Sequence, residues 1–180
     1  MKEIILSIVV LFSGSLCIEG QSNDAQRAST RPALSYEHEE ECGSPLVESM
    51  LWMSVEGTVI KVIDGDSIIL LTKDNERKRV NLVAIDSSAA KDFGRRLLSR
   101  LVLNRIVSVL VNPSDIKRRT IVGVVHGQEK DVNRELLEAG AARFREPAAY
   151  SVSDYTACGY RIVERKAREA KKGLWQSASR

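Results

Sequence analysis

The residues most capable of chemistry are two aspartates, Asp66 and Asp86, at the two ends of a short stretch in which two apolar runs flank a charged turn. Asp66 closes the turn Asp64-Gly65-Asp66, in which Gly65 tolerates the positive φ of a tight hairpin turn. If the chain between the aspartates folds back on itself, their carboxylates converge. Two convergent carboxylates form the beginning of a site for a hard cation, because such ions prefer oxygen ligands.

A second group of candidate residues is cationic. Lys117, Arg118 and Arg119 follow one another, and Arg79 lies between the two aspartates. Such side chains make charge-assisted hydrogen bonds to phosphate oxygens, which gives affinity for a phosphate backbone without reading its sequence. The cationic residues therefore predict contact with nucleic acid or another polyanion. A solvated turn that binds nothing is the alternative for the run of three.

The elements that position these residues can be predicted from hydrophobic periodicity. Gly57 to Asp86 contains three short β-branched or apolar runs separated by two polar turns, the pattern of a curled three-stranded meander. We then expect a helix over 89–103, strands over 106–111 and 120–125, and helices over 132–139 and about 157–172. Five strands with a helix between the third and the fourth resemble an OB-type barrel. The predicted fold is α+β, a five-stranded OB-type β-barrel with about three α-helices.

Four motifs carry a resemblance to a known family. They are VIDGDS from Val62, NLVAIDSSA from Asn81, Lys117-Arg118-Arg119, and Gly173-Leu174-Trp175. The staphylococcal nuclease (thermonuclease) family has V-x-D-G-D-T, R-L-x-G-I-D-x-P-E, Y-G-R and G-L-W in the same order. The chain resembles this family from about Val55 to Trp175, and the resemblance implies the SNase-like fold.

The resemblance also implies what individual residues would do. Family members hydrolyse phosphodiesters with one calcium ion, two arginines on the phosphate, and a glutamate that activates or orients water. Matched position by position, Asp66, Asp86 and the carbonyl of Ser87 would hold the metal, and Arg119 would hold the phosphate. The framework of a metal and phosphate site is thus present.

Two positions depart from the family pattern. Asn81 stands where the family has its first arginine, and Ala89 stands where it has the glutamate. A methyl group can neither accept a proton nor position water, and a neutral amide does not match a guanidinium. We therefore expect a weak or inactive nuclease that binds nucleic acid or another polyanion, with weak calcium binding if any. Arg79, on the same strand face as Asn81, is a candidate replacement for the arginine, and Asp92 for the glutamate.

Other interpretations stay open. With these replacements, the chain would be an active calcium-dependent endonuclease on DNA or RNA. It would otherwise be an interaction module that binds a protein partner. The remaining aspartates and Arg119 also suit an ion-pair network that only stabilises the mouth of the barrel.

Charge is unevenly spread along the chain. Before Ser54 there are 3 Lys and Arg against 8 Asp and Glu, a net charge of −5, and from Val55 onward there are 24 against 16, a net charge of +8. A basic domain suits anionic partners. We expect residues 18–46 to form an acidic polar linker or tail, and residues 47–177 to form the SNase-like domain, which we expect to be a monomer.

The first residues have the pattern of a secretory signal peptide. Lys2 precedes an apolar run over 4–12 that is too short to span a bilayer. We expect cleavage after residues 1–17 and export, to the outside or the periplasm, without a membrane span. A buried N-terminal helix is the alternative. Cys42 and Cys158 then remain as a disulfide candidate, with two unpaired thiols as the alternative.

Overall fold

The computed structural model describes residues 41–43, 52–128, 130–148 and 151–177. The predicted signal peptide, 1–17, and most of the predicted linker, 18–40 and 44–46, lie outside these ranges. The chain divides into two compact units, Met1–Pro32 and Ala33–Arg180, and all described residues belong to the second. Among the helices in the described ranges, none is both long and apolar enough to cross a membrane.

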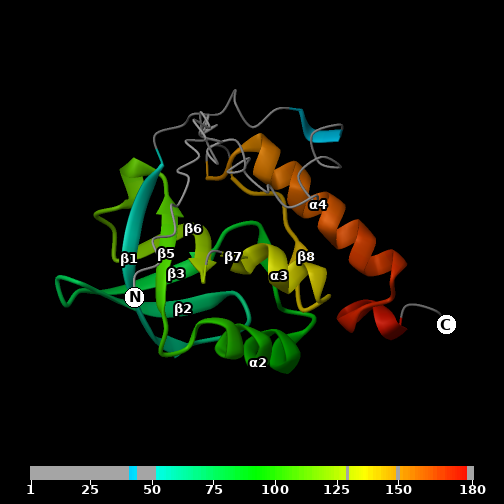
Figure 1. The fold of residues 1–180 in the computed structure, drawn as a ribbon, viewed down its shortest axis with the longest axis horizontal. Coiled ribbons are helices and arrows are strands. Elements are labelled where there is room, and N and C mark those ends of the chain that lie inside the picture. Colours follow the sequence, from blue (N-terminus) through cyan, green and yellow to red (C-terminus); the bar gives the residue numbers. More distant parts are fainter. Residues whose placement is uncertain (1–40, 44–51, 129, 149–150, 178–180) are drawn as a thin grey trace, which may run out of the picture. The chain divides into compact units, whose positions relative to one another are not determined.

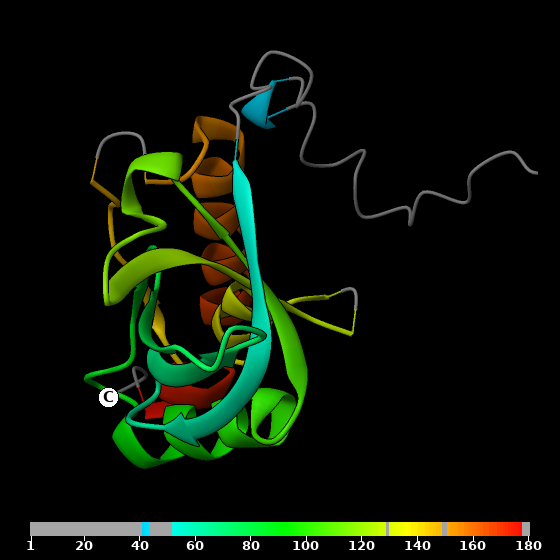
Figure 2. The same cartoon turned by 90° about the vertical axis from the view of Figure 1, so that its left-hand side faces the viewer.

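Five strands form a closed barrel, as the sequence predicts. They are β1 (Met53–Val62), β2 (Ser67–Thr72), β3 (Arg77–Leu82), β5 (Ile106–Val111) and β6 (Thr120–Gly127). The order β3-β2-β1-β5-β6 is antiparallel throughout, and the parallel pairing of β3 with β6 closes the barrel. In Figures 1 and 2, β1 bends across the barrel, so that its first half pairs with β5 and its second half with β2.

Three helices are described outside the barrel wall, which confirms the predicted α+β class. They are α2 (Lys91–Val102), α3 (Val132–Glu138) and α4 (Asp154–Glu169), together with the 3-10 helices η4 (Pro113–Asp115) and η5 (Gly173–Ser177). The side chain of Asp131 caps α3, and the side chain of Ser153 caps α4. In Figure 1, α2 lies below the barrel, and α4 runs along the side away from β1.

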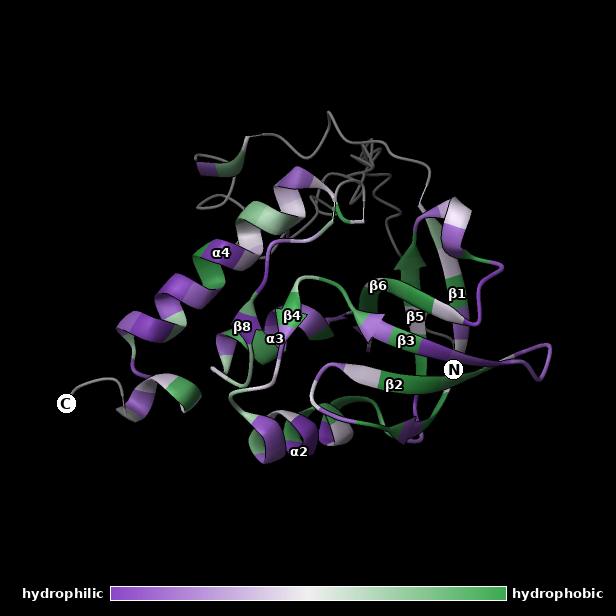
Figure 3. Cartoon of the chain, turned by 180° about the vertical axis from the view of Figure 1, so that it is seen from behind, coloured by the Kyte–Doolittle hydropathy of each residue, from purple (hydrophilic) through white to green (hydrophobic). Residues whose placement is uncertain are grey.

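The core explains why these segments become strands. Apolar side chains alternate with polar ones along β1 and β3, and the inward set is fully buried. The side chains with no exposed surface include Val59, Ile68, Leu70, Val80, Val109, Val111, Ile121 and Val125. Figure 3 shows this division along α2 and α4 as well, where hydrophilic and hydrophobic residues alternate around each helix. Burial of this set is the main force that closes the barrel.

Short elements depart from the prediction. The third strand ends at Leu82 rather than running to Asp86, because Ala84 has a positive φ of 60° that turns the chain. A separate strand, β4 (Ile85–Asp86), follows it and pairs with β8 (Arg143–Phe144), where the sequence predicts a loop. A further short strand, β7 (Lys130–Asp131), pairs antiparallel with the end of β6. Strand β1 begins at Met53, ahead of the predicted Gly57. Two-residue strands leave too short a pattern to be read from periodicity.

Gly65 is needed for a different reason from the one predicted. Among the described glycines, positive φ occurs at Gly43, Gly140 and Gly173, and not at Gly65. A Cβ atom at Gly65 would lie 2.6 Å from the Cβ and 2.8 Å from the Oγ of Ser87. The Asp-Gly-Asp turn is therefore pressed against the segment that follows Asp86, and only glycine permits that approach.

Candidate active site

The Asp64-Gly65-Asp66 turn is held by hydrogen bonds to its own carboxylates. Oδ1 of Asp64 accepts from the N–H of Asp66 at 3.2 Å and from the hydroxyl of Ser67 at 2.7 Å. Oδ2 of Asp66 accepts from both the N–H of Ser87, at 3.0 Å, and the hydroxyl of Ser87, at 2.9 Å. The structure thus brings Asp66 against Ser87, the residue directly after Asp86.

The pKa values of the two carboxyl groups of this turn shift in opposite directions. Burial raises the pKa of Asp66, the nearby Asp64 raises it further, and the hydrogen bonds from Ser87 oppose the rise. Burial alone would also raise the pKa of Asp64. The hydrogen bonds from Ser67 and Asp66, with the positive charge of Arg79, outweigh burial and lower the pKa of Asp64.

Asp86 lies at the end of β4 beside two arginines that the sequence analysis did not single out. Hydrogen bonds from Ser88, including its N–H at 2.9 Å, lower the pKa of Asp86, and the charges of Arg145 and Arg143 lower it further. Arg143 is the β8 partner of Asp86, and the N–H of Arg145 donates to the carbonyl of Ala84 at 3.0 Å. Arg143, Phe144 and Arg145 alternate in polarity, but three residues are too few to predict a strand from the sequence.

These carboxylates do not make a calcium site as they stand. Calcium takes six to eight oxygen ligands, usually with several carboxylates among them. Within the described ranges, no group of three or more His, Cys, Asp or Glu side chains converges. Asp66 and Asp86 both accept protein hydrogen bonds, and the carbonyl of Ser87 already accepts the N–H of Ala90 at 2.9 Å. The donor set matched from the family is therefore too small to fit the ion.

The residue that should activate water is absent from the place where the family has it. Ala89 is exposed in the turn between β4 and α2, and its methyl group has no acidic function. Asp92, the candidate replacement, lies on the exposed side of the first turn of α2 and lines a surface hollow there with Arg95 and Arg96. Among the described residues, no hydrogen bond or ion pair joins Asp92 to Asp66 or Asp86.

The loop that carries Lys117, Arg118 and Arg119, called the cationic loop below, lies beside β3, and hydrogen bonds to its backbone carbonyls fix it there. The N–H of Arg79 donates to the carbonyl of Arg119 at 2.9 Å. The ammonium of Lys78, a buried residue, donates to the carbonyls of Ile116 and Arg118 at 3.1 and 3.3 Å. The loop is therefore held by its main chain, which leaves its charged side chains exposed.

Three side chains of that loop were predicted to contact phosphate. Lys117, Arg118 and Arg119 are all exposed. Arg118 forms an ion pair with Asp115 at 3.1 Å. Within the described ranges, the structure shows no ion-pair or side-chain hydrogen-bond partner for Lys117 or Arg119. These two cations are available to an external anion.

Arg79 reaches the position of the altered residue. Its Nε donates to Oδ1 of Asn81 at 3.3 Å, and a terminal nitrogen donates to the hydroxyl of Ser67 at 3.4 Å. The guanidinium is thus carried over Asn81 towards the Asp64-Gly65-Asp66 turn. The structure brings together Arg79, Asn81 and Ser67, as expected for residues on one face of neighbouring strands.

A hollow of about 630 Å³ lies beside this arrangement, between the end of β3, η4 and the segment 145–148. Asn81, Asp115 and Arg145 supply part of its polar lining, and Leu82 and Val122 part of its apolar lining. The hollow is large enough for a nucleotide-sized group.

The two cysteines are joined. Cys42 and Cys158 form a disulfide with a Cα–Cα distance of 5.7 Å, which ties residues 41–43 to α4. One nitrogen of Arg165 donates to both carboxylate oxygens of the neighbouring Glu41, each at 2.9 Å.

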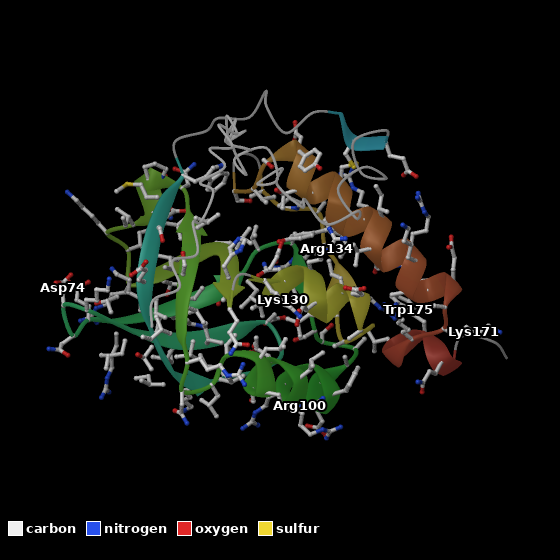
Figure 4. The ribbon with its side chains drawn as sticks, in the orientation of Figure 1. Asp74, Arg100, Lys130, Arg134, Lys171 and Trp175 are labelled. Carbon is white, nitrogen blue, oxygen red and sulfur yellow. A yellow bond between two sulfur atoms is a disulfide. The ribbon has the colours of Figure 1, made fainter. Side chains whose placement is uncertain are left out.

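At the far end of α4, the guanidinium of Arg168 stacks on the ring of Trp175, 4.2 Å from the ring centroid. Figure 4 shows Trp175 at that end of the helix.

Comparisons with known proteins agree with the geometry. The family model described as staphylococcal nuclease homologue matches residues 72–177. A protein of Escherichia coli O157:H7 named an uncharacterized endonuclease is 29% identical over 133 residues, which cover 72% of this chain and 82% of that protein. An uncharacterized endonuclease of Haemophilus influenzae is 34% identical over 88 residues, covering 47% of this chain and 49% of that one.

A further relative is Protein ParB of Escherichia coli, which is 31% identical over 143 residues, covering 72% of this chain and 77% of that protein. The matched family region contains β3, the Asp86 segment, the cationic loop and all three helices. The chain belongs to the staphylococcal nuclease homologue family.

Proposed function

We propose that this protein binds the phosphate backbone of nucleic acid at the site around Arg79 and Arg119, with little or no phosphodiester hydrolysis. The observation that carries the proposal is the exposed methyl group of Ala89 directly after the Asp86 segment. Loss of a group that positions or activates water costs ~10²–10⁴ in rate. The absent first arginine costs a further ~10²–10³ where no other donor replaces it.

Binding does not need the missing groups. Arg79, Lys117 and Arg119 lie on one loop and the adjoining strand, and two of them have exposed charges without an internal partner among the described residues. Arginine and lysine on a fixed backbone suffice for phosphate contacts that read no sequence. We propose that calcium binds no tighter than ~10⁻⁴–10⁻³ M, the range of low-affinity sites, because the oxygen set is incomplete.

We also propose that the protein acts after export. The sequence at 1–17 has the pattern of a signal peptide, and the Cys42–Cys158 disulfide supports an oxidising compartment. Both features support a domain that binds nucleic acid or a comparable polyanion outside the cytosol.

A working endonuclease is the second candidate function. Its support is that two relatives of the chain carry the name endonuclease. The guanidinium of Arg79, which reaches over Asn81, supplies a positive charge close to where the family has its first arginine. This candidate still needs a group that activates water, and the described residues offer none near Asp86.

A cleavage and a binding assay on the same preparation separate the two candidates. Cleavage of single-stranded DNA and RNA is followed with millimolar calcium and with a chelator, and binding is followed by fluorescence anisotropy. We expect salt-dependent binding and no calcium-dependent cleavage above background. A rate within tenfold of an intact family member, abolished by Asp66→Ala, would establish the endonuclease. Absence of binding at low salt would refute the phosphate-binding function.

A further inference from the structure

The exposed face of α2 carries a group of cations that the candidate site does not use. Gly94, Leu98 and Val102 face the core. At about 100° per residue, Arg96 and Arg100 lie on the opposite face of the helix, and Lys91 and Arg95 are exposed beside the core stripe. The three arginines line a surface hollow of about 620 Å³ together with Ser99 and Asp92. Figure 4 shows Arg100 on the side of α2 that points away from the barrel.

These cations differ from the arginines of α4. On α4, Arg161 pairs with Glu146 at 2.7 Å, Arg165 with Glu41 at 2.9 Å, and Arg168 with Glu164 at 3.1 Å. On α2, none of the four cationic side chains has an ion-pair or hydrogen-bond partner among the described residues. The fold therefore uses the arginines of α4 internally and leaves those of α2 for the surroundings.

Helix stability accounts for only part of the charge on α2. Asp92 in the first turn and Arg100 in the last turn both suit the helix dipole, and Asp92 stands four residues before Arg96, a favourable spacing. Lys91 and Arg95, and likewise Arg96 and Arg100, also stand four residues apart, and like charges at this spacing repel each other on a helix. The helix therefore does not need all of these cations, and an anionic ligand accounts for the excess.

The cations of α2 begin where the candidate site ends. The N–H of Ala90, the residue before α2, donates to the carbonyl of Ser87, whose hydroxyl holds Asp66. A Cβ atom at Gly65 would lie 3.0 Å from the carbonyl carbon of Gly94, so the first turn of α2 packs against the Asp64-Gly65-Asp66 turn. An anionic strand that leaves the site over residues 87–90 reaches Lys91 first.

The length of the hollow suits a polymer better than a small anion. From Arg95 to Arg100, the arginines that line the hollow, the helix rises by ~7.5 Å at 1.5 Å per residue. A nucleic-acid strand has one phosphate per ~3.4 Å of duplex axis, so the hollow spans about two phosphate spacings. Guanidinium groups match phosphate oxygens through paired hydrogen bonds. The small side chain of Ser99 lies among the three arginines in the hollow and leaves room for that approach.

We propose that Arg95, Arg96 and Arg100 form a second phosphate-binding surface, the α2 track, which holds the backbone of a nucleic-acid strand whose neighbouring segment lies at the candidate site. The proposal rests on the proposed function, because it assigns the path of the same ligand. The track contacts phosphates and reads no bases, so it adds affinity and salt dependence without sequence preference.

The test compares two variants of the full mature chain with equal change in charge. One is Arg95→Gln/Arg96→Gln/Arg100→Gln, and the control is Arg77→Gln/Lys171→Gln/Lys172→Gln, at exposed cations away from α2 that have no ion pair among the described residues. The probe is a fluorescein-labelled oligothymidylate, followed by anisotropy over a range of salt concentrations. The α2 variant should bind about tenfold more weakly at low salt, and its salt slope should fall by about 2, or ~0.7 per lost phosphate contact. The control should stay near the parent protein.

Two further measurements separate the loss of charge from the loss of the folded state. The variant Arg95→Lys/Arg96→Lys/Arg100→Lys keeps the charge and should recover most of the salt slope, and thermal unfolding should show all variants folded. Equal losses in the α2 variant and the control would overturn the track in favour of net charge alone.

The variant Arg119→Gln separates the failure of the track from the failure of the proposed function. If Arg119→Gln weakens binding while the α2 variant binds like the parent, the track is refuted and the proposed function stands. If the parent itself does not bind the oligothymidylate, both are refuted. Anionic phosphatidylglycerol vesicles are the last probe, because Leu103 and Ile106 are exposed beyond the C-terminal end of α2. Loss of vesicle binding with unchanged oligothymidylate binding in the α2 variant would replace the track with a membrane surface.

Discussion

The candidate site has an acidic side and a cationic side, and the fold holds their charges differently. On the acidic side, the carboxylate oxygens of Asp66 and Asp86 accept hydrogen bonds from the serines that follow Asp86. On the cationic side, backbone carbonyls receive the internal hydrogen bonds, and the charged ends of Lys117 and Arg119 face solvent. The acidic side is thus satisfied from within, and the cationic side is open to a ligand.

This difference separates binding from catalysis. A calcium ion needs many oxygens at one point, so the loss of one carboxylate weakens the whole set. Phosphate binding depends on charges that act more independently, and it survives the replacement of one arginine. The site can therefore lose hydrolysis and keep affinity, and each side can be tested without the other.

Restoring the acidic side should have the largest effect. We expect Ala89→Glu/Asn81→Arg to raise calcium-dependent cleavage of single-stranded DNA by ~10²-fold or more over the parent, because the change supplies a third carboxylate and a second guanidinium. Each single change should do much less, since groups that act as a unit are not additive. Initial rates on a fluorescent oligonucleotide measure this.

The matched control for that gain is the same double change combined with Asp66→Ala, which should stay at background. An inert double variant that folds and binds nucleic acid like the parent would show that the turn over 87–90 has departed too far from catalytic geometry. The acidic side would then be a structural network, and the comparison between the two sides would become sharper.

Removing a charge from the cationic side should have the next largest effect. Arg119→Gln should weaken binding of a labelled oligonucleotide by about tenfold, the value of one charge-assisted hydrogen bond to phosphate of ~1.5–3 kcal/mol at its lower end. Asp66→Asn, the counterpart on the acidic side, should leave affinity unchanged or slightly higher. Equal losses in both variants would mean that the two sides bind as one unit.

The support beneath the cationic side is a buried lysine. Lys78→Met should lower the free energy of unfolding by ~1–3 kcal/mol, because the carbonyls of Ile116 and Arg118 lose their donor. Denaturant unfolding measures this, with Lys73→Met as control. The Lys73 side chain is 77% exposed and pairs with the exposed Glu56, so its loss should cost much less than the loss of Lys78. Equal costs would show that Lys78 does not fix the loop.

The barrel and its helices could be predicted because their signals are local. The alternation along β1 and β3, the turn at Asp64 and the stop at Gly140, whose φ is 63°, are each readable within a few residues. The site was harder, since its decisive contacts join distant segments. The pairing of β4 with β8, which sets Arg143 beside Asp86, depends on packing between segments far apart in sequence.

The fold decides whether a charged side chain is free to bind a ligand, and the sequence pattern does not show this. Lys78 lies between Arg77 and Arg79 and looks like one more surface cation, yet its side chain is largely buried and its ammonium contacts two carbonyls and the carboxylate of Glu76. Asp66 matches a metal ligand by type and position, yet Ser87 occupies one of its oxygens with two hydrogen bonds. Sequence identifies the chemical group, and only the fold shows whether it is free.

The smallest expected effect concerns the charge balance of Asp86. Ser88 hydrogen bonds and then the charges of Arg145 and Arg143 hold the pKa of Asp86 below its ordinary value of 3.8. A lowered pKa in the folded state contributes stability above the unfolded value, and this contribution is lost as the pH falls through the folded pKa. Arg145→Gln should raise the pKa of Asp86, so the variant should be slightly less stable above about pH 4 and equal to the parent in stronger acid. Carboxyl NMR titration measures the shift, with Arg105→Gln, at an exposed arginine between α2 and β5, as control. An unchanged pKa would mean that Arg145 does not contribute to the ionisation of Asp86, which would then depend on Ser88 and Arg143, and Arg145 would count with the cationic side as a charge available to a phosphate.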